Sequence, residues 1–402
     1  SLYWNLRPID PAAVTPPPAP SLVSRERGFA LLRAEEGPAY WESPKPAVSQ
    51  QFGMYYVHYV HDCFSILQFV ANNRLLYNKM GRPKKRKGYA GGDDWKDHVR
   101  GHCGVGRDVL KAQPVDRGND GCANQRIRED LAGPGRFSAV RAAGVYPGVD
   151  QERALLLCDE YLLDVFHLVA AEPRTYDWQI LAYGERVADD HTWQPVAEWQ
   201  GRDAERIHLH ETQVFDAGDA AWQVSLQQDE QDRRPGVGVR IHMLGEADSL
   251  VLDSVPPGLT AEEATSLLVT RQKPATTFAA VHEPFADGPA SAPLQRVVRI
   301  DESADAVGFR LQGAALDDRV LIAYGDGAEA AQTIDDEQES FIFTGFAFIR
   351  ATPERITVQG QLQAMQLLVE GEPELVIGGE TVAASTAVPC VGGLRGEGEY
   401  SR

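Results

Sequence analysis

The sequence predicts an all-β protein: a large antiparallel β-sandwich followed by a smaller C-terminal β-sandwich. Short apolar segments recur between Gly, Pro, Asp and Asn residues, and helical periodicity is scarce. From about residue 294 these segments become closer and more regular. We therefore expect a Pro-rich N-terminal linker over residues 1–26, the large sandwich over residues 27–290 and the small one over residues 291–402.

The predicted strands of the large sandwich are short apolar runs bounded by turn residues. Residues 11–22 contain five prolines and indicate an extended linker before the first strand. Ala154–Leu157 and Tyr161–Val169 flank Cys158-Asp159-Glu160, a pattern typical of a hairpin. We expect further strands at Arg27–Arg33, Gln213–Phe215, Trp222–Leu226, Val237–Leu244 and Thr277–His282.

One segment of this region is predicted to be helical. Ala261–Leu268 follows Pro256-Pro257-Gly258, and Thr260 is suited to cap a helix that begins there. Glu262 and Glu263 suit the positive end of the helix dipole. We therefore expect one short helix before the small sandwich.

The small sandwich is predicted from strand-like runs at close, fairly regular spacing. The segment GPASAPLQ precedes them and indicates a boundary. Gly392–Arg402 is polar and is expected to be a frayed tail. The seven runs are RVVRI, AVGFRLQ, RVLIAYG, SFIFTGFAFIRA, ERITVQG, MQLLVEG and ELVIGG.

The composition argues against several classes of protein. Apolar residues make up 43% and charged residues 24%, as in ordinary globular proteins. The net charge of −19 argues against general attraction to nucleic acid or anionic membranes. No apolar run reaches the roughly 18 residues of a membrane span. Five cysteines leave the redox compartment open, and Cys158 is expected to be a buried thiol.

The most informative stretch is a histidine-rich window over residues 56–108. Imidazole, carboxylate and amide side chains are concentrated there around the apolar run Phe64–Val70. Such groups at the ends of apolar strands indicate a site on a rigid floor, which is a metal site, a catalytic edge, or both. The residues concerned are His58, His61, Asp62, Asn78, His98 and His102.

A basic run interrupts the window. Residues 82–87 (RPKKRK) hold five cations in six positions, among them Arg82, Lys84 and Lys85. One interpretation is a solvated loop. Another is the capture of an acidic substrate, which the location inside the window favours. A nuclear import signal is the weakest of the three interpretations.

A series of short motifs runs through residues 27–285 in a definite order. It includes Asp62-Cys63-Phe64-Ser65-Ile66, Asn73-Arg74-Leu75-Leu76-Tyr77-Asn78, Tyr89, Trp95, the segment from His102 to Asp108, Tyr146-Pro147-Gly148-Val149, Asp164-Val165-Phe166, Thr175-Tyr176-Asp177-Trp178 and Thr277 through Pro284. In order and spacing these motifs resemble the C-terminal half of the heparinase II/III-like polysaccharide lyases.

The resemblance implies a large antiparallel β-sandwich packed on an N-terminal (α/α) toroid, with a substrate cleft between them. It implies β-elimination of an acidic, uronate-containing glycan, such as a glycosaminoglycan or alginate, by a secreted or periplasmic protein. Only 26 residues precede the first predicted strand. We therefore expect either that a separate chain carries the toroid or that this chain is not a complete lyase. The N-terminus, which lacks an initiator Met and a leader pattern, indicates a processed or truncated end.

A uronate lyase must neutralise the substrate carboxylate, remove the neighbouring proton and protonate the leaving oxygen. His58 stands four residues before Asp62, where the resemblance implies a histidine at the cleft. We interpret His58 as the charge neutraliser or general base, with Tyr56 or Tyr59 as acid/base or stacking residue. The alternative is that His58 is a surface histidine on an aromatic-rich strand.

Arg174 is a candidate for substrate binding. It stands where many family members have a histidine before Thr-Tyr-Asp-Trp, and its guanidinium is suited to bidentate binding of a carboxylate. The alternative is a loop arginine paired with Asp177 or Glu172. Arg82, Lys84, Lys85 and Trp95 complete the predicted substrate contacts.

The resemblance also implies a structural zinc ion, held by histidine and aspartate. The carried-over ligands here are His61 and His102, with Asn78 and Cys103 nearby in the motifs. Val60 stands where the usual metal histidine lies, and the neutral amide of Asn78 is a poor zinc ligand. A Cys63–Cys103 disulfide or two buried thiols explain the cysteines without a metal.

These departures from the family pattern favour a rival function. The rival is a non-catalytic carbohydrate-binding or assembly module that has lost the lyase chemistry. A purely structural surface protein is a third alternative.

Overall fold

A computed structural model confirms the all-β prediction. It describes residues 16–52, 64–78, 125–146, 148–187, 189, 191–196, 210–228, 236–255, 260–336, 339–368, 374–377, 380–382, 387–390 and 393–400. These ranges hold 26 strands in two sheets and no α-helix. Their three short 3-10 helices are η2 (Pro38–Glu42), η7 (Pro289–Ser291) and η8 (Gly325–Glu329).

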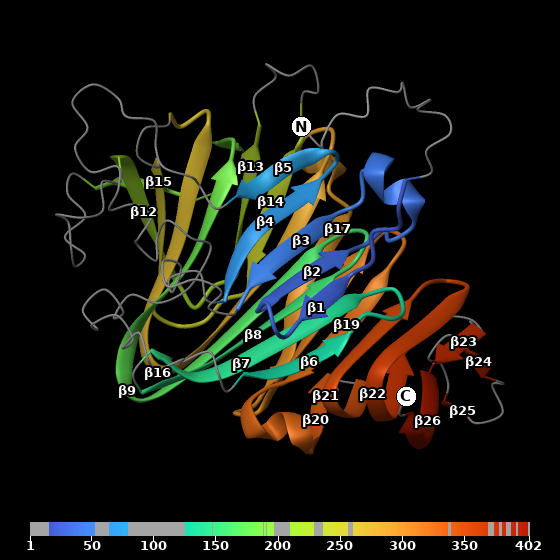
Figure 1. Cartoon of the computed structure of the whole chain (residues 1–402). Coiled ribbons are helices and arrows are strands. Elements are labelled where there is room, and N and C mark those ends of the chain that lie inside the picture. Colours follow the sequence, from blue (N-terminus) through green and yellow to red (C-terminus); the bar gives the residue numbers. More distant parts are fainter. Residues whose placement is uncertain are drawn as a thin grey trace, which may run out of the picture.

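The larger sheet, sheet A, contains two strands of 22 residues each, β9 (Leu162–Tyr183) and β16 (Ala264–Phe285). They pair with each other in antiparallel fashion, with a shift of register between Lys273 and Ala275. Figure 1 shows the pair curving together at one edge of the molecule. Because of this curve, sheet A folds over into two layers.

The outer layer of sheet A is built on residues 175–183 of β9 and 264–273 of β16. β5 pairs with this part of β9, and β15 pairs with this part of β16. The further strands of the outer layer are β1 (Leu22–Ser24), β2 (Phe29–Arg33), β3 (Ala47–Gln51), β4 (Ser65–Ala71), β5 (Arg74–Asn78), β15 (Ser249–Val255), β12 (His210–Gly218) and β11 (Gln194–Pro195).

The middle layer of sheet A is built on residues 162–170 of β9 and 275–285 of β16. β8 pairs with this part of β9, and β14 pairs with this part of β16. The further strands here are β6 (Arg126–Asp130), β7 (Arg136–Tyr146), β8 (Val149–Leu157), β14 (Gly238–Met243) and β13 (Trp222–Gln227), with β10 (Glu185–Val187) at the edge.

The smaller sheet, sheet B, packs on the face of the middle layer that points away from the outer layer. All its strand pairs are antiparallel except β22 with β23, within the described residues. Its strands are β17 (Leu294–Glu302), β18 (Ala306–Gly313), β19 (Asp317–Ala323), β20 (Ala331–Asp336), β21 (Glu339–Ala351), β22 (Arg355–Leu368), β23 (Glu374–Ile377), β24 (Glu380–Val382), β25 (Ala387–Cys390) and β26 (Gly393–Tyr400). The predicted domain limits stay a prediction.

The middle layer is buried on both faces, which explains its continuous apolar runs. Leu162 and Phe166 of β9 lie in the core between the two layers, and Leu163 and Val165 lie in the core against sheet B. Side chains alternate across a strand, so a strand covered on both sides needs apolar residues at successive positions. The predicted hairpin is also confirmed, because β8 and β9 pair in antiparallel fashion from Leu157 and Leu162 onward.

The predicted helix at Ala261–Leu268 is wrong. Residues 261–263 form a turn, and β16 begins at Ala264. A capping hydrogen bond is nevertheless present, because the Thr260 backbone N–H donates to Glu263 Oε2 at 2.8 Å. Only one turn follows, since residues 264–270 are all buried between β9 and β15. Pairing on both sides outweighs the local helical signal.

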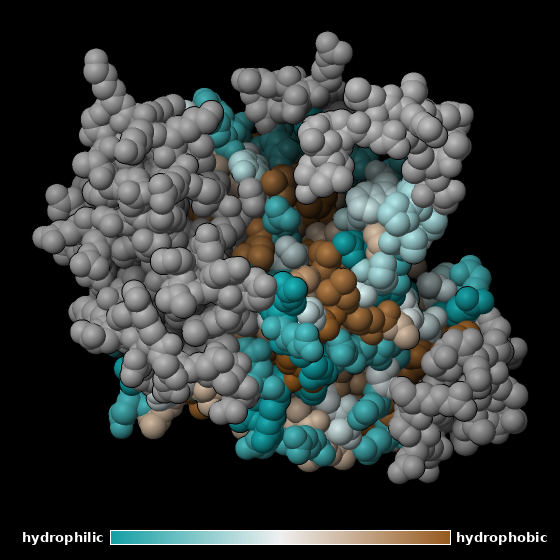
Figure 2. All heavy atoms as spheres, viewed as in Figure 1, coloured by the Kyte–Doolittle hydropathy of each residue, from teal (hydrophilic) through white to brown (hydrophobic). Residues whose placement is uncertain are grey.

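Other strand predictions differ in detail. The runs ERITVQG and MQLLVEG form one continuous strand, β22, and β20 was not predicted. Residues 22–24 of the predicted linker form β1 and pair with β2. The visible face of the molecule is mixed, with hydrophilic residues over its lower part and hydrophobic ones near its centre (Figure 2). Within the described ranges, no helix has the length and apolar character needed to cross a membrane.

Candidate functional site

Most of the predicted site residues lie outside the described residues. Of the twelve, Asn78 ends β5, where only the backbone is described, and Arg174 lies in β9. The other ten are Tyr56, His58, Tyr59, His61, Arg82, Lys84, Lys85, Trp95, His102 and Cys103.

The described residues that border the window lie together at one end of the outer layer. Gln51 pairs with Ser65 across β3 and β4, and Gln68 pairs with Asn78 across β4 and β5. The Gln125 amide nitrogen donates a hydrogen bond to the carbonyl oxygen of Phe52. Residues that precede and follow both undescribed parts of the window are therefore brought to the same edge of the sheet.

A buried ion pair lies in the core directly behind this edge. Arg153 of β8 binds Asp164 of β9 in bidentate fashion, with distances of 2.7 Å from Nε to Oδ1 and 2.6 Å from Nη2 to Oδ2. Both side chains are fully buried. Trp178 Nε1 donates a third hydrogen bond to Asp164 Oδ2 at 2.9 Å. The buried carboxylate of Asp164 therefore has a cation and three hydrogen bonds to offset the cost of its burial.

A histidine and a tyrosine extend this cluster across the two layers. Tyr77 of the outer layer and His282 of the middle layer are hydrogen-bonded, with 2.8 Å between the hydroxyl oxygen and Nδ1. His282 Nε2 lies 3.9 Å from Asp164 Oδ2, which is too long for a hydrogen bond. The ring of His282 stacks on Trp178 at 5.8 Å. The cluster is thus a group of buried polar side chains surrounded by an apolar core.

The charges of the cluster are fixed by burial and by Arg153. Burial raises the pKa of the Asp164 carboxyl, but the charge and hydrogen bonds of Arg153 outweigh burial and hold this pKa well below its usual range. Burial lowers the pKa of His282 and outweighs the opposing effect of Asp164. Asp164 is therefore a carboxylate and His282 a neutral imidazole at pH 7.

The cluster holds the border of the window in place. Arg153 Nη1 donates to the carbonyl oxygen of Phe64 at 2.6 Å, and the Phe64 ring stacks on Phe166 at 6.0 Å. Phe64 has a φ of 65°, a conformation that costs a non-glycine residue about 1–3 kcal/mol. Because its members are buried, the cluster positions the backbone at the edge and does not itself contact a substrate.

Arg174 lies at the bend of β9, away from this edge. It pairs with Lys273 across β9 and β16 and is half-buried. Ala182, which pairs with Tyr77, is eight positions further along β9 (182 − 174), or roughly 26 Å of extended strand. The structure does not bring Arg174 next to Asn78. Its role in binding a substrate stays a prediction.

The outward face of the outer layer carries a row of polar side chains that the sequence analysis missed. Tyr176, Trp178 and Ile180 point into the core between the layers, and Asp177 and Gln179 alternate with them. Gln179 Nε2 donates to Ser266 Oγ of β16 at 2.9 Å. The signal in the sequence is the strict alternation of polar and apolar residues from Thr175 to Ile180. All four polar side chains of this row are buried, with exposed fractions of 8% for Thr175, 3% for Asp177 and 2% each for Gln179 and Ser266.

The described residues contain no group of three or more His, Cys, Asp or Glu side chains that could hold a metal ion. The candidate zinc ligands of the window are not among them, apart from the backbone of Asn78. Cys158 is a free, buried thiol, as expected, and burial raises its pKa.

Comparison with known proteins identifies the fold. No protein-family model matches the sequence, and no curated protein matches it. A structure of heparinase III matches with a TM-score of 0.52 and 10% identity, over 77% of this chain and 43% of that one. A mutant heparan sulfate lyase from Pedobacter heparinus gives 0.50 and 10%, over 76% and 42%. A heparinase III with methylated lysines gives 0.51 and 11%, over 76% and 42%.

At this level of identity the similarity concerns the fold. The chain spans less than half the length of the lyases it matches, the share expected of a C-terminal half. The fold implied by the motifs of residues 27–285 is therefore confirmed.

Proposed function

We propose that this chain is the β-sandwich portion of a polysaccharide lyase that cleaves an acidic, uronate-containing glycan by β-elimination. The observation that carries the proposal is the meeting of the window borders, Phe52, Phe64, Asn78 and Gln125, at one edge of a heparinase-like sandwich. That edge is built on the fixed cluster of Arg153 and Asp164, which holds the backbone of Phe64. A rigid floor of this kind suits a saccharide cleft.

The window supplies the residue types that the reaction needs. The base removes the proton on the carbon next to the carboxylate, and that electron pair forms a carbon–carbon double bond as the bond to the 4-linked oxygen breaks. We assign the base or the neutralisation of the carboxylate to His58, and protonation of the leaving oxygen to Tyr56 or Tyr59. Arg82, Lys84, Lys85, Trp95 and Arg174 are the proposed substrate contacts.

The remaining machinery is proposed to lie in an (α/α) toroid. The described residues form strands and short 3-10 helices only, so none of them belongs to such a toroid. We propose that the toroid comes from a separate chain or from another part of a longer one. An acidic polysaccharide as ligand also implies a location outside the cytoplasm.

The test is a cleavage and binding assay on the purified chain. Uronate-containing glycans are added, and the absorbance of the unsaturated uronate product is followed while binding is measured on the same mixture. We expect the wild type to bind a uronate-containing glycan and His58→Ala to bind it more weakly, because His58 is proposed to lie at the substrate carboxylate. Any product that forms should fall at least tenfold in His58→Ala, because general acid–base groups contribute about 10²–10⁴-fold. His210→Ala, outside the window, is the matched control.

The outcomes separate the alternatives. Cleavage by this chain alone would refute the need for a separate toroid. Binding without cleavage, unchanged in His58→Ala, would favour the non-catalytic carbohydrate-binding or assembly module. That rival is favoured by Asn78, which stands at the border edge in place of an aspartate. Absence of both binding and cleavage would overturn both functions.

A structural zinc ion is proposed separately, with His61 and His102 as ligands and Asn78 and Cys103 beside them. Asn78 lies at the edge where the window borders meet, so a ligand at this position could reach both parts of the window. Zinc would tie these parts together. We expect His102→Ala to lose the bound zinc found in the wild type by elemental analysis, and His210→Ala to keep it. An unchanged metal content in His102→Ala would end the proposal.

A further inference from the structure

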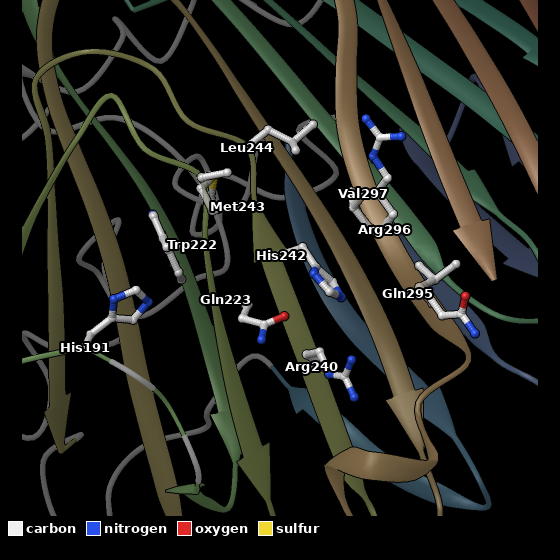
Figure 3. Close-up of a pocket in the computed structure, with 12 residues that line it drawn as sticks. His191, Trp222, Gln223, Arg240, His242, Met243, Leu244, Gln295, Arg296 and Val297 are labelled. Carbon is white, nitrogen blue, oxygen red and sulfur yellow. The ribbon is translucent and has the colours of Figure 1, made fainter.

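A pocket of about 360 Å³ lies where the middle layer meets sheet B. In the strand order of sheet A, β9 and β16 stand between its strand β14 and the window border at β5. β13 and β14 form one side and β17 the other (Figure 3). Its polar lining residues are Trp222, Gln223, Arg240, His242, Gln295 and Arg296. None of residues 64–78, the part of the window that the structure describes, lines it.

Strand alternation places the polar side chains of β14 in this pocket. Val239, Ile241 and Met243 lie in the core between the layers, so Arg240 and His242 point to the other face. There Gln223 of β13 pairs directly with His242, as Figure 3 shows. The pocket therefore lies on the face of the middle layer that is turned away from the outer layer and its proposed cleft.

A buried carboxylate fixes the two sides of the pocket to each other. Glu283 of β16 is fully buried and accepts a hydrogen bond from His242 Nε2 at 2.9 Å. It also accepts one from the backbone N–H of Leu294, the first residue of β17. Arg240 Nη1 lies 3.7 Å from Glu283 Oε2. The donors of β14 and the start of β17 are thus held in one arrangement.

The lining is cationic in a chain of strongly negative net charge. The described lining residues include two arginines, Arg240 and Arg296, and no Asp or Glu, whereas the chain carries −19 overall. Glu283 offsets part of the charge of Arg240, so Arg296 supplies the uncompensated charge. Arg296 is exposed, and its polar contact among the described residues is Gln312 Oε1 at 3.4 Å, with no carboxylate within salt-bridge distance. The pocket therefore attracts an anion.

The size and the neutral groups of the pocket favour a saccharide over a small oxyanion. Its volume falls within the range of about 300–1,000 Å³ that is usual for organic ligands. The amides of Gln223 and Gln295 are exposed, and each offers both donors and an acceptor. Trp222 of β13 also lines the pocket, but its indole lies in the core between the layers, where Phe215 contacts it edge-on at 5.7 Å. It adjoins Gln223 and therefore serves as a reporter for the pocket, not as a binding group.

We propose that this pocket is a second saccharide-binding site, which takes a sugar unit bearing a carboxylate or a sulfate ester. Arg296 and Arg240 bind the anionic group, and the amides of Gln223 and Gln295 bind the hydroxyls. The site does not depend on the proposed lyase chemistry, because the four residues proposed to bind the sugar lie outside the window. It would hold an acidic glycan beside the molecule whether or not the chain cleaves it.

The test follows the Trp222 indole signal in the whole chain labelled with ¹⁵N-tryptophan, assigned by comparison with Trp222→Phe. The probes are a glucuronate–N-acetylglucosamine disaccharide, its sulfated form, neutral lactose and sodium sulfate. We expect both acidic disaccharides to shift the signal and lactose to leave it unchanged. Arg296→Gln should weaken binding about tenfold, because a charge-assisted hydrogen bond is lost at an exposed position.

Arg25→Gln is the matched control. Arg25 is an exposed arginine in the turn after β1 that pairs with Glu129, so the substitution removes the same charge away from the pocket. It should leave the affinity unchanged. Equal affinity in wild type and Arg296→Gln would overturn the proposal, and so would equal binding of lactose or of sulfate alone. Loss of cleavage in the lyase assay has no effect on these readouts, so the two proposals fail independently.

Discussion

Replacing Asp164 with Ala should lower the free energy of unfolding by about 3–5 kcal/mol, the usual cost of breaking a buried ion pair. The substitution leaves the fully buried Arg153 guanidinium without its bidentate partner and removes the acceptor of Trp178 Nε1. It also loosens the support of the Phe64 carbonyl. Chemical denaturation at pH 7 measures the loss.

Two variants control this experiment. Asp326→Ala removes a carboxylate that also pairs with arginine but is 84% exposed, and it should have a far smaller effect. The double variant Arg153→Met with Asp164→Leu should recover much of the loss, because apolar residues replace the pair without leaving a buried charge. A loss below about 1 kcal/mol in Asp164→Ala would contradict a fixed cluster.

The same pair predicts the acid side of the stability profile. Arg153 holds the pKa of Asp164 below the 3.8 of an unperturbed aspartate, so the native state favours the carboxylate. This contribution is fully present above pH 3.8 and is lost as the pH falls through the lower native pKa. The difference in unfolding free energy between wild type and Asp164→Ala should therefore shrink below pH 3.8 and be constant above it.

Replacing Phe348 with Ala should cost about 3–5 kcal/mol and should weaken the joint between sheet B and sheet A. Phe348 of β21 is fully buried in the core that sheet B shares with the middle layer. Beside it, Phe346 stacks on Phe137 of β7 at 3.8 Å. Because this core contains side chains of both sheets, the wild type should unfold in a single transition.

Hydrogen exchange locates the effect. In Phe348→Ala the backbone amides of β18 and β19 should exchange faster relative to those of β3 and β4, because sheet B opens more readily than sheet A. Ile342→Ala on the same strand is the control, since Ile342 is 36% exposed and contributes less. Two separate transitions in the wild type would show that the sheets are independent and would contradict the prediction.

Local signals in the sequence predicted most strands but not every ending. The apolar run of Tyr161–Val169 predicted the start of β9, because a strand covered on both faces shows no alternation. The same signals predicted a helix at Ala261–Leu268, where the cap at Thr260 is real but the next residues pair with two strands. Helix capping is local, whereas the pairing of β16 with β9 joins Ala264 to Tyr183, 81 positions earlier in the chain.

The candidate sites divide in the same way. Chemical type and order along the chain indicated the window with His58, whose catalytic role stays a prediction. The contacts of the buried cluster could not be predicted in this way, since nothing in the sequence pairs Arg153 with the carbonyl of Phe64, 89 positions away. The pocket at Arg240 and Arg296 was also missed, because its sides come from different sheets.

The sequence by itself therefore determined the all-β class and the approximate strand positions, and the chemistry of the window stays a prediction. These properties follow from side-chain alternation, turn residues and residue type, all of which act within a few positions along the chain. The tertiary structure alone decided the folding of sheet A into two layers, the buried cluster behind Phe64 and the cationic pocket. Those features depend on which distant strands pair and on which face each side chain then occupies, and local sequence patterns do not specify either.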